Sequence, residues 1–124
     1  MSDLKKSIRP EIKTIVSTKG MSPEEKFQNE VLRPIIKLQH DLLLAFFEDH
    51  LARKKVDIRK LTLSKKSELL ANIFANDNRF KTELRGLIIG HFTKDEYAVY
   101  RKMPVEINKR IMGIVRERLL SVLL

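Results

Sequence analysis

SPEEKFQNEVLRPIIKLQHDLLLAFFEDHLAR, the stretch of residues 22–53, decides the fold. At 100° per residue, its apolar side chains cover an arc of ~200° around a helix. These side chains are Phe27, Val31, Leu32, Ile35, Ile36, Leu38, Leu42, Leu43, Ala45, Phe46 and Phe47. A helix at a protein surface shows a narrower apolar stripe. We therefore expect other helices to cover this one on two sides.

Residues that favour helix ends mark the start of this stretch. Ser22 is a typical N-cap, and Pro23 suits the first helical position because its missing amide hydrogen is not needed there. Pro34 lies inside the pattern, where that missing hydrogen removes a backbone hydrogen bond. We expect either a kink at Pro34 or a new turn that begins after Arg33.

The rest of the chain also shows helical patterns. We expect one helix capped by Ser64, another capped by Asp77, a third that begins with the capping box Thr93–Glu96, and a last helix opened by Pro104. No segment shows sustained alternation of apolar and polar residues. The sequence predicts an all-α fold, a compact bundle of four to six helices around one long, largely buried helix, in a single domain over residues 1–124.

The first 20 residues are the hardest to place. Leu4, Ile8 and Ile12 have helical spacing, but Pro10 would interrupt a helix that passed through all of them. We expect a short helix that starts at Pro10, followed by a linker over residues 17–21.

Composition narrows the classes of protein. The 124 residues are 43% hydrophobic and 33% charged, which is typical of a globular chain. The absence of cysteine excludes disulfides, thiolate metal sites and cysteine nucleophiles. The first residues lack the apolar run of a signal peptide, and no stretch approaches the ~20 apolar residues of a membrane span. These observations predict a cytoplasmic protein with no membrane partner.

No catalytic or metal-binding motif is visible. The three histidines, His40, His50 and His91, show no spacing that would place several ligands around one ion. Serine and threonine residues occur outside any nucleophile motif. The sequence predicts no catalytic residue, no metal and no cofactor.

Four polar residues lie within the apolar faces of the predicted helices: Gln39, His50, Asn108 and Arg118. Buried polar groups usually form hydrogen bonds, so these side chains are expected to bond between helices and fix their register. The alternative is a small internal pocket that holds a polar ligand.

The net charge of +9 includes a concentrated basic stretch. Between residues 53 and 66, seven basic side chains stand against one acid; they are Arg53, Lys54, Lys55, Arg59, Lys60, Lys65 and Lys66. Such a run is suited to a nucleic-acid backbone. It contains no aromatic residue on which bases could stack, and a solvated surface is the other interpretation.

Several leucines project away from the main apolar stripes. Leu44 and Leu51 do so on the long helix, and Leu120 and Leu124 do so near the end of the chain. Grouped apolar side chains outside the core favour self-association or a protein partner.

Three strings carry a resemblance: residues 25–39, the segment Gly90-His91-Phe92-Thr93 and the segment Asn108-Lys109-Arg110. With these strings the chain resembles, from about residue 22 onward, a group of short, uncharacterised, all-helical bacterial proteins, some of which are labelled glyoxalase. Glyoxalase I proteins hold a metal on strands of repeated βαβββ units, which this sequence lacks, so we regard the label as a misnaming. The function expected is that of a small, non-catalytic binding or interaction protein that forms homo-oligomers. Nucleic-acid binding is the first alternative, and a glyoxalase-like lyase or small-ligand binder with a polar pocket is the second.

Overall fold

The computed structural model describes residues 2–11 and 20–123, and over these ranges the all-α prediction is confirmed because no strand is present. The helices are α1 (Ser2–Ser7), α2 (Pro23–Phe27), α3 (Arg33–Leu38), α4 (His40–Arg53), α5 (Leu63–Asn76), α6 (Asn78–Ile89), α7 (Lys94–Tyr100) and α8 (Pro104–Leu123). A π-helical segment, η1 (Gln28–Leu32), joins α2 to α3, and a 3-10 turn, η2 (Ile58–Lys60), precedes α5.

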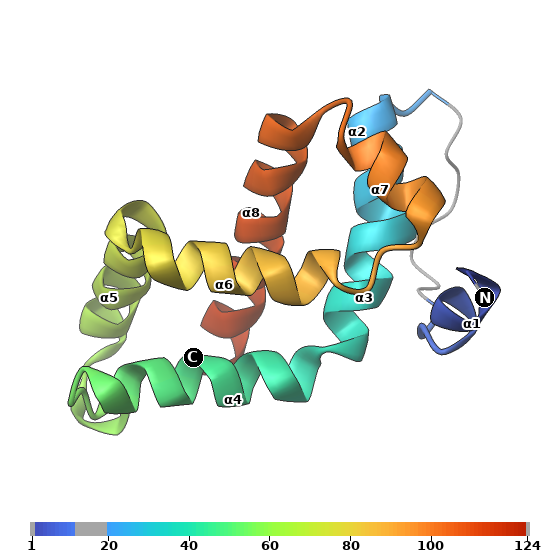
Figure 1. Ribbon diagram of the computed structural model, residues 1–124. Helices are drawn as coiled ribbons and strands as arrows, with labels where there is room; N and C mark the ends of the chain where they lie inside the picture. The colour runs from blue at the N-terminus through green and yellow to red at the C-terminus, as the bar shows by residue number, and fades with distance from the viewer. Residues whose placement is uncertain (1, 12–19, 124) are drawn as a thin grey trace.

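Helix α8 occupies the centre of the fold (Figure 1). It packs against the α2–α3 segment on one side and against α5 and α6 on the other. Its buried side chains, Ile107, Ile111, Ile114, Val115 and Leu119, repeat at three- and four-residue intervals and belong to the hydrophobic core. The long stretch 22–53 was expected at the centre, but the C-terminal helix takes that place.

The stretch 22–53 is helical over almost its whole length but forms two limbs. Helices α3 and α4 meet at Gln39 at a steep angle (Figure 1). The Gln39 ψ angle is 7°, far from the value of about −42° in a straight helix. The apolar arc is also less buried than its width suggested, because Leu42 is 49% exposed and Ala45 is exposed.

Pro34 acts differently from either expectation. The chain stays helical through this residue, and the wider π-helical segment η1 comes directly before it. Within that segment the Arg33 amide bonds to the Gln28 carbonyl, five residues earlier. A π-helical turn of this kind is one of the known ways in which a helix absorbs a local defect.

The predicted helix starts are mostly confirmed. The side chains of Ser22 and Asp77 accept hydrogen bonds from the amides of Glu25 and Phe80, as N-caps do. The exception is α5, whose N-cap is Thr62 and not Ser64, since the Thr62 hydroxyl accepts the Lys65 amide at 3.2 Å.

The N-terminal prediction is wrong where it can be compared. Helix α1 precedes Pro10, and Pro10 and Glu11 lie outside any helix. The remainder of the short helix that we expected from Pro10, and most of the expected linker, fall within residues 12–19, outside the described residues. In the part of the chain that the structure covers, no helix has the length and apolarity needed to cross a membrane.

Candidate functional site

Gln39, the first of the four predicted pocket residues, bonds to the end of a neighbouring helix. Its side chain is buried, and its Nε2 donates to the Leu87 carbonyl of α6 at 3.2 Å. Carbonyls in the last turn of a helix lack helical partners, and the His91 amide bonds to Ile88 instead of Leu87. Gln39 therefore satisfies a carbonyl of α6 while it forms the corner between α3 and α4.

His50 lies at the far end of α4, against the start of α6. Its Nε2 is 3.0 Å from an Asp77 carboxylate oxygen, out of line for a hydrogen bond, and its ring packs on Phe80. Lys54 also reaches Asp77, at 2.9 Å. The hydrogen bond from Lys54, together with the Phe80 amide, lowers the pKa of Asp77 below its ordinary value. Asp77 is therefore an anchor for α4 as well as an N-cap for α6.

Asn108 and Arg118 lie on α8 and contact two further partners. The Tyr100 hydroxyl of α7 donates to Asn108 Oδ1 at 2.8 Å. Arg118 Nη1 lies 3.2 Å from His40 Nδ1, and the imidazole nitrogen accepts because a guanidinium only donates.

The four predicted pocket residues are thus brought into four separate contacts. Two of the contacts reach opposite ends of α6, from Gln39 and from His50, and the other two join Asn108 of α8 to α7 and Arg118 of α8 to α4. This arrangement agrees with the expectation that buried polar groups fix helix register. A shared pocket for these four residues stays a prediction.

Most of the predicted nucleic-acid residues have contacts within the chain. The partners are Asp49 for Arg53, Asp77 for Lys54, Asp57 for Arg59, Glu68 for Lys65 and the Leu123 carbonyl for Lys66. Lys55 and Lys60 are exposed. Because nearby carboxylates offset much of its charge, the basic stretch offers less positive potential than its composition suggests.

Three of the four leucines expected to form a self-association surface lie in the described residues and are buried or partly buried. Leu51 is only 3% exposed, and Leu44 and Leu120 are partly buried against the core. Leu124 lies outside the described residues. Homo-oligomerisation stays a prediction, but Leu44, Leu51 and Leu120 pack against or within the core.

A cleft of about 620 Å³ between α6 and α8 brings together a set of residues that the sequence did not group. On α6, Asn78, Lys81, Thr82 and Arg85 share one face, since they are spaced by three or four residues. The facing residues of α8 follow the same spacing, and they are Val105, Asn108, Lys109 and Met112. Phe74, near the end of α5, completes the wall.

The polar lining of the α6–α8 cleft is dominated by hydrogen-bond donors. Lys81, Arg85 and Lys109 supply three positive charges, and no carboxylate is among the described residues that line it. Across the described ranges 2–11 and 20–123, no ion pair involves any of these three cations. Like charges that face one cleft without a counter-charge favour an anion there.

Asn108 adds a donor because its amide is held in one orientation. Its Oδ1 already accepts the Tyr100 hydroxyl, so the Nδ2 group is the end that remains for other partners. Tyr100 is 8% exposed, which keeps this hydrogen bond away from bulk solvent. Asn108 is the one residue of the predicted pocket that lines this cleft.

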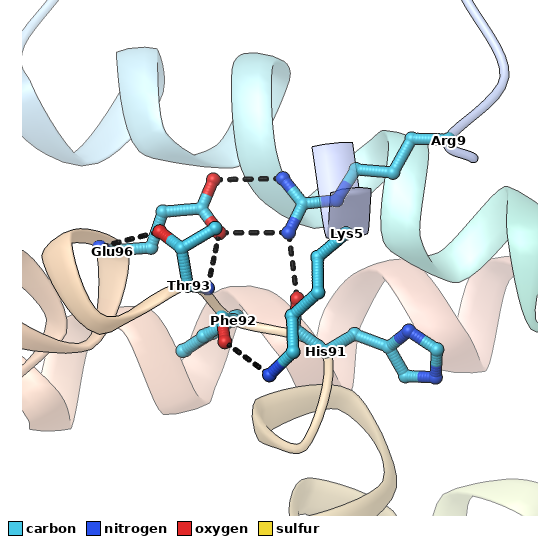
Figure 2. Close-up of polar contacts among 6 residues, drawn as sticks. All are labelled: Lys5, Arg9, His91, Phe92, Thr93 and Glu96. Carbon is cyan, nitrogen blue, oxygen red and sulfur yellow. Dashed lines mark hydrogen bonds and ion pairs between the residues drawn. The ribbon is translucent and has the colours of Figure 1, made fainter. Parts of the chain in front are cut away.

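A second polar cluster joins the N-terminal segment to the turn between α6 and α7 (Figure 2). Arg9 binds Glu96 through two contacts of 2.7 Å, and the two side chains are only 6% and 9% exposed. Arg9 Nη2 also donates to the His91 carbonyl at 2.6 Å, and Lys5 Nζ donates to the Phe92 carbonyl at 3.0 Å. Two cations of the N-terminal segment thus bond the carbonyls that follow the C-terminus of α6, where a helix dipole favours positive charge.

Glu96 has two roles in this cluster. It closes the predicted capping box, which is confirmed, because Oε1 accepts the Thr93 amide while the Thr93 hydroxyl accepts the Glu96 amide. Burial would raise the pKa of Glu96, but the hydrogen bonds from Arg9 and Thr93 outweigh burial and lower this pKa below its usual value. Burial, and then the charges of Arg9 and Lys5, lower the pKa of His91.

Among the described residues, no group of three or more histidine and acidic side chains is arranged to hold a metal ion. Comparison with known protein families, with curated proteins and with solved structures gives no match. The candidate site is therefore argued from its own geometry.

Proposed function

We propose that this protein works by binding a small organic phosphate in the cleft between α6 and α8. The observation that carries the proposal is the lining of that cleft, in which three cations and an oriented amide line one space. Among the described residues, none of the three cations forms an ion pair, and Lys81 bonds only to the Ala75 carbonyl, at 3.5 Å. A volume of about 620 Å³ lies in the range of small-molecule sites, which is roughly 300–1,000 Å³.

The chemistry of the lining favours a phosphate over other anions. Arg85 presents a planar guanidinium, which suits the paired oxygens of a phosphate. Lys81 and Lys109 add two point charges, from α6 and from α8. Together, three cations match a group that carries two or more negative charges better than they match a single carboxylate.

The apolar part of the lining favours an organic ligand over free inorganic phosphate. Phe74, Val105 and Met112 supply carbon surface at the cleft, and Val105 is 70% exposed. Covering such a side chain with the apolar part of a ligand gains free energy in proportion to the area buried. The described residues of the lining include no carboxylate or imidazole. We propose that the protein binds its ligand in the cytoplasm.

Isothermal titration calorimetry with inorganic pyrophosphate tests the charged half of the site. The folded wild-type chain is expected to bind it with a stoichiometry of one. The double variant Lys81→Gln, Arg85→Gln removes two of the three cations without adding a negative charge. It is expected to weaken binding by roughly 100-fold or more, since each of the two charge-assisted hydrogen bonds contributes about 1.5–3 kcal/mol and about 1.4 kcal/mol is a tenfold change in affinity.

A matched control removes the same charge elsewhere. Arg53→Gln with Arg59→Gln takes two cations from the basic stretch, and pyrophosphate affinity is expected to stay within about twofold of the wild type. Equal losses in both double variants would show non-specific attraction to net charge and would contradict the cleft. Selective loss in the Arg53, Arg59 variant would favour the nucleic-acid alternative.

A further inference from the structure

Helix α7 joins two parts of the molecule through two side chains on one of its faces. Glu96 and Tyr100 are four residues apart on this helix, and both are buried. Glu96 accepts hydrogen bonds from Arg9 of the N-terminal segment. The Tyr100 hydroxyl donates to Asn108 in the lining of the α6–α8 cleft. A short helix therefore connects the N-terminal segment to the proposed phosphate site.

The N-terminal segment fixes the position at which α7 begins (Figure 2). Arg9 bonds to Glu96 in the first turn of α7 and to the His91 carbonyl shortly before it. Lys5 bonds to the Phe92 carbonyl in the same turn. Because the Arg9–Glu96 pair is buried, its loss would leave a buried carboxylate without its counter-charge. The start of α7 would then have to move to bring Glu96 to water.

Aromatic packing carries such a movement toward Tyr100. The Phe92 ring packs against the rings of Phe27 and Tyr100, with centroid distances of 5.4 and 5.7 Å. Side chains packed this closely do not shift independently of their neighbours. A displacement of the turn that carries Phe92 would therefore disturb the Tyr100 hydroxyl and its hydrogen bond to Asn108.

We propose that Arg9 is a positioning residue for the phosphate site, because it holds α7 where Tyr100 orients the Asn108 amide. This role rests on the proposed function, since phosphate affinity is the quantity that it changes. Arg9 is not among the residues that line the α6–α8 cleft, so it acts through α7 and not on the ligand. The N-terminal segment thereby regulates the site. Its docking on α7 strengthens phosphate binding, and bound phosphate strengthens its docking by the same factor.

A double-mutant cycle, measured by calorimetry with inorganic pyrophosphate, tests this coupling. Arg9→Met is expected to weaken binding about 2- to 10-fold, because one oriented hydrogen bond is lost at the site. In the Tyr100→Phe background we expect Arg9→Met to have no further effect, since the bond through which Arg9 acts is already absent. Equal losses in the two backgrounds, or no loss in either, would overturn the positioning role. If the wild type did not bind pyrophosphate at all, the phosphate site itself would fail, and this role with it.

Two single variants separate positioning from stability. Arg9→Lys keeps a positive charge that can pair with Glu96, and we expect its affinity for pyrophosphate to return to within about twofold of the wild type. Arg118→Met removes another partly buried arginine, whose contact is His40 of α4, and it is expected to leave the affinity unchanged. All variants are compared where circular dichroism shows the helix content of the wild type. A loss in Arg118→Met as large as that in Arg9→Met would contradict the role.

Hydrogen exchange in the wild-type chain tests the same coupling without a substitution. The Arg9 Nε hydrogen is buried, so it exchanges with solvent when the N-terminal segment leaves α7. Saturating pyrophosphate is expected to slow this exchange about 2- to 10-fold, the same factor as the loss in Arg9→Met. The Arg118 Nε hydrogen is also buried and is the matched control, whose exchange should not change. No slowing at Arg9, or equal slowing at both arginines, would overturn the proposal.

Discussion

Replacement of Arg9 by methionine is expected to destabilise the fold strongly. The change keeps an apolar stem but removes both contacts to Glu96 and the hydrogen bond to the His91 carbonyl. Because Glu96 is 8% exposed, its carboxylate would be left buried without its partner. Removal of one member of a buried ion pair costs about 3–5 kcal/mol.

Urea denaturation, followed by far-UV circular dichroism at neutral pH, measures this cost as the loss in free energy of unfolding. The control is Arg53→Met, which removes an arginine that is paired with Asp49 but 60% exposed. Exposed pairs contribute about 0.2–1 kcal/mol, so this variant should remain close to wild type. If Arg9→Met cost no more than Arg53→Met, the N-terminal segment would not be held to α7 as described here.

Three further predictions concern single side chains. The pKa of Glu96 is lower in the folded state than its ordinary value of 4.5, so the ionised side chain stabilises the fold fully above about pH 4.5. That stabilisation is lost as the pH falls through the folded-state pKa. Glu96→Gln should therefore lower the free energy of unfolding at neutral pH and make it vary less with pH on the acid side. Gln39→Leu should cost about 1–3 kcal/mol in urea denaturation, because it leaves a carbonyl of α6 without a donor, and unchanged or raised stability would contradict the register role. Tyr100→Phe frees the Asn108 amide and should weaken pyrophosphate binding roughly 2- to 10-fold in calorimetry, whereas Tyr97→Phe, on the exposed face of α7, should not change it.

The local parts of the fold could be predicted because they depend on neighbours in sequence. Ser22, Asp77 and the capping box Thr93–Glu96 act within four residues of themselves, and each was identified from the sequence. The corner at Gln39 could not be foreseen. No proline or glycine marks it, and the side chain that accompanies it bonds to Leu87, 48 residues away.

The candidate site was missed for the same physical reason. Lys81, Arg85 and Lys109 each lie on a polar helix face, and such faces usually point to solvent. The spacing of Asn78, Lys81, Thr82 and Arg85 on one face was visible in the sequence. That this face meets a similar face of α8 depends on tertiary packing, which periodicity does not encode. Conversely, the basic stretch is a continuous feature of the sequence, but the fold places a carboxylate beside four of its seven basic side chains.

The most direct test of the central claim is a titration of the ¹⁵N-labelled chain with inorganic pyrophosphate, monitored by two-dimensional amide NMR. The account predicts saturable shift changes concentrated at Lys81, Arg85, Asn108 and Lys109, on the two helices that line the cleft. Changes confined to residues 53–66, or small changes spread over every basic residue, would contradict it.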